Sequence, residues 1–298
     1  MEQVLILIGN PDQTGDVAPA AELAHRALAA AGGVAEGVLR LGPDAAEFAF
    51  AGLSPEAAQT AVRAALAGRP FDLAALPRAG RRKRLLVADM DSTIIGCECI
   101  DELADFAGLR AKVAGITERA MRGELDFKSA LQARVAMLSG LPESVLEQTY
   151  RERVRLNPGA RELVQTMRRN GAMTALVSGG FTYFTSRVRE ACGFAIDQGN
   201  ELLLESGRLT GEVRRPILDS GAKLAMLERL RQEGALDATE TLAVGDGAND
   251  LPMVQAAGLG VAYRAKPLVA ASARARIDHG NLTALLYLQG YRREEFVT

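Results

Sequence analysis

The chain has 298 residues, 48% of them hydrophobic, and its 35 basic residues nearly balance its 37 acidic ones. A net charge of −2 gives no indication of a nucleic-acid partner, and no apolar run approaches the ~18 residues of a membrane-spanning helix. The two histidines lie outside any motif and the three cysteines form no CxxC pair, which argues against a Ser-His-Asp hydrolase and a zinc site. Unpaired thiols are typical of a cytoplasmic protein.

Residues 1–78 predict a small α+β domain. The expected elements are a strand over 4–8, a loop over 9–15, an alanine-rich helix to about Ala31, two strands within 34–51, a helix over 54–67 and a strand over 71–76. Their order is βαββαβ. Pro77, Gly80 and the basic run 81–84 then indicate a solvated linker, so we expect a second domain over 84–298.

Three short apolar runs in this second domain are each followed by a polar or glycine-rich cluster. Residues 85–88 precede Asp89-Met90-Asp91, residues 174–177 precede Ser178-Gly179-Gly180, and residues 241–244 precede the cluster 245–250. Apolar strands separated by helices are typical of a doubly wound parallel sheet covered on both faces. Ligands of such sheets bind beyond the carboxyl ends of the strands, so we expect the three clusters to meet there.

A helical insert is predicted between the first two clusters. Apolar residues at helical spacing over about 96–157 indicate a four-helix cap that could close over the site. The segment 202–209 has the turn chemistry of a β-hairpin.

Asp89 and Asp91 carry the first chemical hypothesis. Two acids at the end of a buried strand suit a nucleophile and an acid/base placed around one metal ion. The alternative is an ordinary exit from strand to loop. Similarly, Ser178-Gly179-Gly180 could be only a tight loop, and Lys223, on a predicted helix, could be only a surface charge.

Four motifs in order make chance a poor explanation. DMDST at 89–93, SGG at 178–180, Lys223 within DSGAKLAML, and GDGANDLPM at 245–253 resemble the haloacid dehalogenase superfamily, and within it the phosphoserine phosphatases. The resemblance spans Arg84 to the C-terminus. The order βαββαβ of the first 78 residues is similar to the ACT regulatory domain, which implies amino-acid sensing, a homodimer through this domain, or a merely stabilising module.

The resemblance implies a role for each motif residue. Asp89 would be the nucleophile, Asp91 the acid and base, and Ser178 and Lys223 further catalytic residues. Mg²⁺ would be bound by Asp89, Asp91 and Asp246, with Asp250 holding phosphate, lysine or metal-bound waters, and hard oxygen ligands of this kind suit Mg²⁺. The phosphate would be bound by Ser178, Gly179, Gly180, Lys223 and Asn249.

In the cap, the resemblance implies substrate recognition. Glu98 would contact an ammonium, Arg134 would grip a carboxylate, and Met121 and Phe127 would form walls of the pocket. Without the resemblance, Glu98 is an acid in a first helical turn, Arg134 a solvated charge, and the other two residues bundle core. The expected reaction is hydrolysis of O-phospho-L-serine to L-serine and phosphate, the last step of serine biosynthesis. A related phosphatase or phosphotransferase acting on phosphohomoserine or another small phosphomonoester is the alternative, and an amino-acid-binding regulatory protein is a further one.

Overall fold

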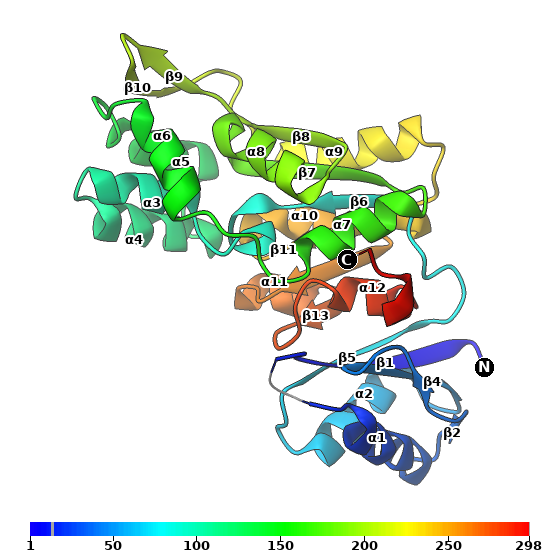
Figure 1. The fold of residues 1–298 in the computed structure, drawn as a ribbon. Helices are drawn as coiled ribbons and strands as arrows, with labels where there is room; N and C mark the ends of the chain where they lie inside the picture. The colour runs from blue at the N-terminus through cyan, green and yellow to red at the C-terminus, as the bar shows by residue number, and fades with distance from the viewer. Residues whose placement is uncertain (13–14, 298) are drawn as a thin grey trace.

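A computed structural model describes residues 1–12 and 15–297. Residues 13–14, which belong to the loop expected over 9–15, lie outside the described residues. The structure contains an N-terminal antiparallel sheet, a six-stranded parallel sheet, and a group of helices beside the parallel sheet (Figure 1). None of the helices in the described ranges combines the length and apolar character needed to cross a membrane.

The parallel sheet has the order β13-β12-β11-β6-β7-β8. Its strands are β6 (Leu85–Ala88), β7 (Met173–Phe181), β8 (Ile196–Asn200), β11 (Thr241–Gly245), β12 (Leu259–Tyr263) and β13 (Ala275–Ile277). The strand β6 lies between β11 and β7, so the three strands expected to carry the polar clusters are neighbours.

Alternation along β6 explains why helices cover both faces. Leu85 and Val87 pack in one core with α9 (Ser220–Glu233) and α10 (Leu251–Ala256), whereas Leu86 and Ala88 pack in another with α7 (Ala160–Arg169) and α8 (Thr182–Cys192). Strand side chains point alternately to opposite faces, so a strand that is apolar throughout can be buried on both. The expected doubly wound sheet is therefore confirmed.

Four cap helices connect β6 to β7: α3 (Cys99–Phe106), α4 (Arg110–Met121), α5 (Phe127–Ala136) and α6 (Ser144–Glu152). They lie at one end of the parallel sheet in Figure 1, together with the hairpin of β9 (Leu202–Glu205) and β10 (Arg208–Val213). The helical cap and the hairpin were both predicted from the sequence. Ser206 and Gly207 have φ of 50° and 73°, the positive values that a tight two-residue hairpin turn requires.

The N-terminal sheet has the order β2-β4-β1-β5, with β3 also paired to β4. Its elements are β1 (Gln3–Gly9), α1 (Ala18–Ala30), β2 (Val34–Ala35), β3 (Leu39–Arg40), β4 (Ala45–Ala51), α2 (Pro55–Leu66) and β5 (Phe71–Pro77). The expected order of elements is present, but the first of the two strands within 34–51 is divided into two short pieces, β2 and β3.

The two faces of this sheet have different partners. Leu5 and Leu7 of β1 pack with the helices α1 and α2, whereas Val4, Ile6 and Ile8 join the large core that includes α12 (Ala284–Leu288). In Figure 1, α12 and β13 lie directly against the sheet on the side opposite α1 and α2. The sheet is therefore buried on both faces within one chain.

Buried polar contacts hold this junction together. Tyr287 donates its hydroxyl to Asp44 at 2.7 Å, and Asp72 accepts backbone N–H groups of Asp278 and Gly280 at 2.8 and 2.7 Å. Buried polar groups need such partners because an unpaired one costs free energy.

The interpretation of the basic run 81–84 as a solvated edge is wrong for Arg81. Its guanidinium makes a two-point ion pair with Glu47 at 2.6 and 3.1 Å, and the two side chains are only 12% and 9% exposed. Arg82 and Arg84 remain about half exposed or more, although they pair with Glu295 and Glu240. The segment therefore contributes to the junction as well as connecting the two sheets.

Candidate active site

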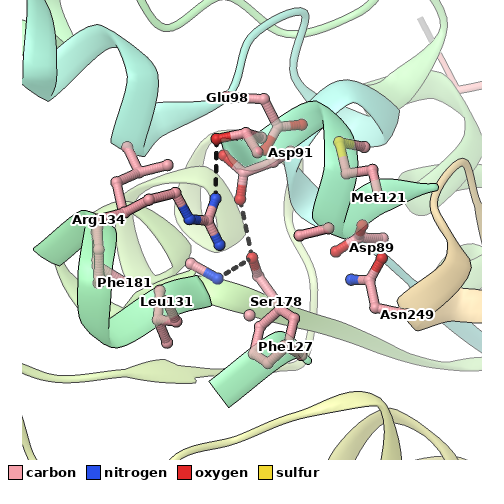
Figure 2. A pocket seen from close by; sticks show the side chains of 15 residues that line it. Asp89, Asp91, Glu98, Met121, Phe127, Leu131, Arg134, Ser178, Phe181 and Asn249 are labelled. Carbon is pink, nitrogen blue, oxygen red and sulfur yellow. Dashed lines mark hydrogen bonds between the residues drawn. The ribbon is translucent and has the colours of Figure 1, made fainter. Parts of the chain in front are cut away.

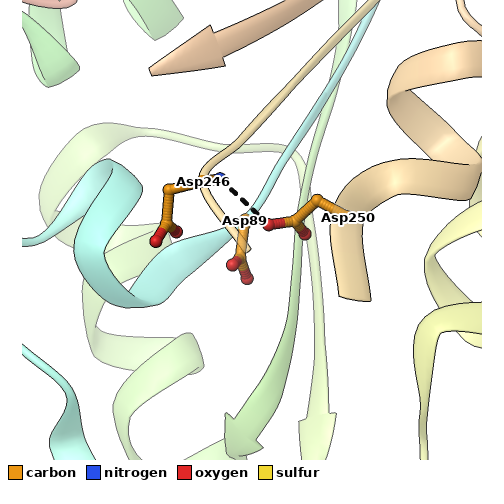
Figure 3. A group of neighbouring side chains, drawn as sticks. All are labelled: Asp89, Asp246 and Asp250. Atoms are coloured by element: carbon orange, nitrogen blue, oxygen red, sulfur yellow. Dashed lines mark hydrogen bonds between the residues drawn. The ribbon is translucent and has the colours of Figure 1, made fainter. Parts of the chain in front are cut away.

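The ends of β6 and β11 bring three buried aspartates together. Asp89 follows β6, while Asp246 and Asp250 follow β11, and one carboxylate oxygen from each lies within 4.8 Å of the others (Figure 3). Adjacent parallel strands end at the same edge of a sheet, which explains how residues more than 150 positions apart meet.

Lys223 is the cation of this group. Its Nζ lies 2.6 Å from Oδ1 of Asp89 and 2.6 Å from Oδ1 of Asp250, and its side chain is 2% exposed. Although burial alone would lower it, the charges of Asp250 and Asp89 raise the pKa of Lys223 above its ordinary value. The lysine is therefore a buried, charged partner of two carboxylates and not a surface charge.

The carboxylate of Asp250 is fully occupied. Its Oδ1 accepts from Lys223, and its Oδ2 accepts the backbone N–H groups of Asp246 and Gly247, each at 3.0 Å. A side chain on Gly245 would collide with Asp250, so the glycine is required for this close approach. Asp250 thus fixes the loop that carries Asp246.

Asp89 and Asp246 each keep one carboxylate oxygen without a hydrogen bond from the described residues. Oδ1 of Asp89 accepts from Lys223 and from the N–H of Met90, and Oδ1 of Asp246 accepts from Thr93 at 3.1 Å. Burial, and then the charge of Asp250, raise the pKa of both Asp89 and Asp246 well above the ordinary value. The raised pKa values reflect first the burial of these carboxyls and then the negative charge of Asp250, which Lys223 offsets only in part.

The donor set suits a divalent cation. Three buried carboxylates and one ammonium leave two negative charges uncompensated when the acids are ionised, and buried charge is costly unless it is paired. The free oxygens of Asp89 and Asp246 are hard ligands of the kind that Mg²⁺ prefers. These two residues fit a magnesium ion better than Asp250, whose oxygens are already engaged.

Asp91 turns away from Asp89 and faces the cap. The chain leaves the strand through Ser92, which has φ of 55°, a left-handed conformation that non-glycine residues rarely adopt. Oδ1 of Asp91 accepts the N–H of Cys99 at 2.9 Å, and Oδ2 accepts the hydroxyl of Ser178 at 2.9 Å. Backbone strain of this kind is found at functional sites, where the surrounding structure enforces it.

The SGG motif lies at the irregular end of β7 and not in a loop beyond it. The N–H of Gly180 donates to Ser178 Oγ at 2.8 Å. A Cβ on Gly180 would lie 2.7 Å from Asp91 Oδ2, and one on Gly179 would lie 2.5 Å from the ring of Phe127. Glycine at both positions is therefore required by close contacts with the acid and with the cap.

A cavity of about 50 Å³ lies between these strand ends and the cap (Figure 2). The strand ends and the turns that follow them contribute Asp89, Asp91, Ser178, Gly179, Gly180, Phe181 and Asn249 to its lining. The cap contributes Glu98, Ile100, Thr117, Ala120, Met121, Phe127, Leu131 and Arg134. Ten of the thirteen expected site residues line this cavity. The other three, Asp246, Asp250 and Lys223, lie against Asp89 outside the lining. This volume holds a few water molecules.

Two charged cap residues face this cavity. Oε1 of Glu98 accepts the hydroxyl of Ser92 at 2.6 Å, and burial, followed by the charge of Asp91, raises the pKa of Glu98 to about 8. Arg134 is 5% exposed, and burial lowers its pKa. In the described part of the chain, no carboxylate lies within 4.0 Å of the Arg134 guanidinium. The cavity therefore contains a buried cation that no carboxylate of the described residues contacts directly, although the charges of Glu98, Asp101 and Asp91 act on it from further away.

Sequence reasoning missed three hydroxyl side chains that hold the acids and the cation. Thr93 donates to Asp246, Ser92 donates to Glu98, and Thr117 accepts from Nη1 of Arg134 at 2.9 Å. Ser92 and Thr93 belong to the DMDST motif and could have been singled out there. Nothing in the sequence around Thr117 distinguishes it from a helical surface threonine.

Comparisons with known proteins agree with this geometry. The sequence pattern of the haloacid dehalogenase-like hydrolases matches residues 86–255. The chain is similar to a phosphoserine phosphatase of Streptomyces coelicolor, with 44% identity over 84% of this chain and 62% of that relative. It thus spans less than two thirds of that relative's own length.

Two solved structures resemble nearly the whole chain. A haloacid dehalogenase-family hydrolase of Salmonella enterica serovar Typhi has a TM-score of 0.82 and 28% identity, covering 96% of this chain and 97% of the other. A probable phosphoserine phosphatase of Vibrio cholerae has a TM-score of 0.77 and 34% identity, covering 97% of this chain and 86% of the other. Since the family pattern also spans more than half of the sequence, the chain belongs to the haloacid dehalogenase-like hydrolase family.

Proposed function

We propose that the chain is a magnesium-dependent phosphoserine phosphatase that releases L-serine and phosphate in the last step of serine biosynthesis. One observation carries the choice of substrate: the buried guanidinium of Arg134 faces the cavity that Asp89 lines, and it has no carboxylate partner among the described residues. A substrate carboxylate would supply the missing charge, and Glu98 in the same cavity would meet the substrate ammonium. The similarity to proteins named phosphoserine phosphatase supports the same substrate.

The first half of the proposed reaction forms a phosphoenzyme. Oδ2 of Asp89 attacks phosphorus, the bond from phosphorus to the serine oxygen breaks, and Asp91 gives its proton to that oxygen. Lys223, held against Oδ1 of Asp89, favours the ionised form of the nucleophile and offers positive charge to the phosphoryl group.

The second half regenerates the enzyme. Asp91 takes a proton from water as the water oxygen attacks phosphorus, and the bond from phosphorus to Asp89 breaks to release phosphate. Ser178 and the N–H group of Gly179, at the end of β7 and just before α8, would donate to the phosphoryl oxygens, and the N–H of Gly180, which donates to Ser178 Oγ, would hold that side chain in place. Asn249, which lines the same cavity, would orient the phosphate.

Asp89, Asp246 and the backbone carbonyl of Asp91 would hold Mg²⁺, with Asp250 fixing the loop of Asp246. When bound, the ion would neutralise negative charge on the transferring phosphoryl group. The two uncompensated negative charges of the aspartate cluster support this assignment.

The test is phosphate release from a panel of phosphomonoesters, with and without Mg²⁺. We expect O-phospho-L-serine to have the highest kcat/KM, and chelation of the metal to abolish turnover. If phosphohomoserine or a substrate without amino and carboxyl groups has the highest kcat/KM, the assignment to phosphoserine is wrong.

We also propose a division into an N-terminal ACT-like domain (residues 1–78) and a catalytic domain (84–298) whose cap spans about 96–157. Two sheets with separate strand orders support this division.

The same proposal places the enzyme in the cytoplasm, where the free thiols of Cys97, Cys99 and Cys192 stay reduced. A homodimer through the N-terminal domain is the expected assembly. Sedimentation in an analytical ultracentrifuge measures the mass of the assembly in solution and tests this expectation.

A further inference from the structure

A line of hydrogen bonds crosses three cap helices and ends at Arg134. Thr117 of α4 donates its hydroxyl to Oδ1 of Asp101 on α3 at 2.6 Å, and it accepts from Nη1 of Arg134 on α5 at 2.9 Å. Thr117 and Arg134 are 3% and 5% exposed, so water does not replace these bonds easily. Figure 2 shows the last bond of this line, between the guanidinium and a neighbouring cap side chain.

Donor and acceptor chemistry fixes the direction of the line. A guanidinium can only donate, and an ionised carboxylate can only accept. The single hydroxyl proton of Thr117 therefore points toward Asp101, with the carbonyl of Val113 as a longer alternative at 3.1 Å. A lone pair of Thr117 is then left to face Arg134.

The same contacts decide which donors of Arg134 remain for a ligand. Its Nε donates to the carbonyl of Ala130 at 3.2 Å, and one N–H of Nη1 donates to Thr117. Of the five N–H donors of a guanidinium, three stay available, and they belong to Nη1 and Nη2. Two of these suffice for a two-point contact with a carboxylate.

We propose that Thr117, oriented by Asp101, is a positioning residue that aims the guanidinium of Arg134 at the substrate carboxylate and so contributes to substrate specificity. This inference rests on the proposed function, because it concerns the carboxylate that Arg134 would bind. An arginine side chain has many rotamers in a cavity, and fixing it in advance reduces the entropy lost when the substrate binds.

The experiment compares two substrates that share a phosphate and an ammonium. O-phospho-L-serine has a carboxylate and O-phosphoethanolamine has none. Thr117→Val keeps the shape of the side chain and removes the hydroxyl, so kcat/KM for phosphoserine should fall about ten- to a hundredfold, mainly through KM, since a hydrogen bond to a charged group is lost. The value for phosphoethanolamine should change by less than about twofold on the same reasoning.

Two further variants separate positioning from general damage to the cap. Thr117→Ser restores the hydroxyl and should restore most of the loss. Thr149→Val is the matched control, because Thr149 of α6 is fully buried in the cap but its hydroxyl has no hydrogen-bond partner in the described structure. It should leave both substrates unchanged.

Equal losses on the two substrates, or no rescue by serine, would overturn the inference and leave Thr117 as a support of the cap alone. If Thr117→Val does not fold, Asp101→Ala decides, since Asp101 lies at the less buried end of the line and alanine removes the acceptor of the Thr117 hydroxyl. A loss confined to phosphoserine would support the inference, and a loss that is not selective for phosphoserine would overturn it. Failure of the proposed function looks different, because the unaltered chain would then not prefer phosphoserine at all.

Discussion

Replacing Arg134 by alanine is the sharpest test of substrate recognition. The guanidinium is 5% exposed and has no carboxylate in direct contact within the described chain, so a bound substrate carboxylate would be its direct ion-pair partner. Removing one partner of such a buried pair costs about 2–5 kcal/mol, because the other charge is left unpaired in a closed cap. At about 1.4 kcal/mol for each factor of ten, kcat/KM for phosphoserine should fall between about 30-fold and a few thousandfold.

The assay is steady-state phosphate release with phosphoserine and with phosphoethanolamine. The second substrate should be nearly unaffected, because Asp89 and the aspartate cluster are untouched. Arg119→Ala is a matched control: Arg119 lies on the cap helix α4, its side chain is 58% exposed, and its partner is the surface residue Glu124. It should leave both substrates unchanged.

A loss of the same size on both substrates would refute the reasoning, provided that circular dichroism shows a folded protein. Arg134 would then stabilise the cap through its contacts with Thr117 and Ala130, and its lack of a direct carboxylate contact among the described residues would have no bearing on substrate choice.

Three other predictions concern the nucleophile, the ammonium site and the junction. Asp89→Asn should lower phosphate release by several orders of magnitude while leaving the fold intact, since the covalent nucleophile is lost; near-normal turnover would exclude the phosphoenzyme. Because burial and Asp91 raise the pKa of Glu98 to about 8, its carboxyl is largely protonated below that pH and ionises as the pH rises through it. The preference for phosphoserine over 3-phospholactate, which lacks the ammonium, should therefore increase as the pH rises toward about 8, and a preference that does not vary with pH would contradict this role. A chain that begins at Gly80 keeps every expected catalytic residue but exposes α12, so it should unfold at a lower temperature and aggregate more readily than the full chain; an unchanged Tm would show that the N-terminal sheet adds no stability.

Local patterns were sufficient to predict the strand ends and their acids. Apolar runs followed by acidic or glycine-rich clusters predict parallel strands whose carboxyl ends meet, and the structure brings Asp89, Ser178 and Asp246 to one edge for that reason. The cap helices were predicted because their apolar residues recur at helical spacing, and that signal is also local.

Contacts between distant segments could not be predicted in this way. The partner of Arg81 is Glu47, 34 positions earlier, and nothing near Arg81 indicates that a carboxylate will approach it. Similarly, the alternation of β1 predicts that two faces exist, but it does not predict that α12 will cover one of them. Thr117 illustrates the same limit within the site, because its importance comes entirely from side chains on two other helices.

The cover over the N-terminal sheet has a consequence for synthesis of the protein. Strand β1 is made before α12, which covers Val4, Ile6 and Ile8 and follows only after residues 78–283. At ~5–20 residues per second, that delay lasts ~10–40 s. During this time the sheet can form with α1 and α2 on one face, while its other face presents apolar side chains to the solvent. The nascent chain is therefore exposed to aggregation, and accessible to chaperones, until α12 emerges.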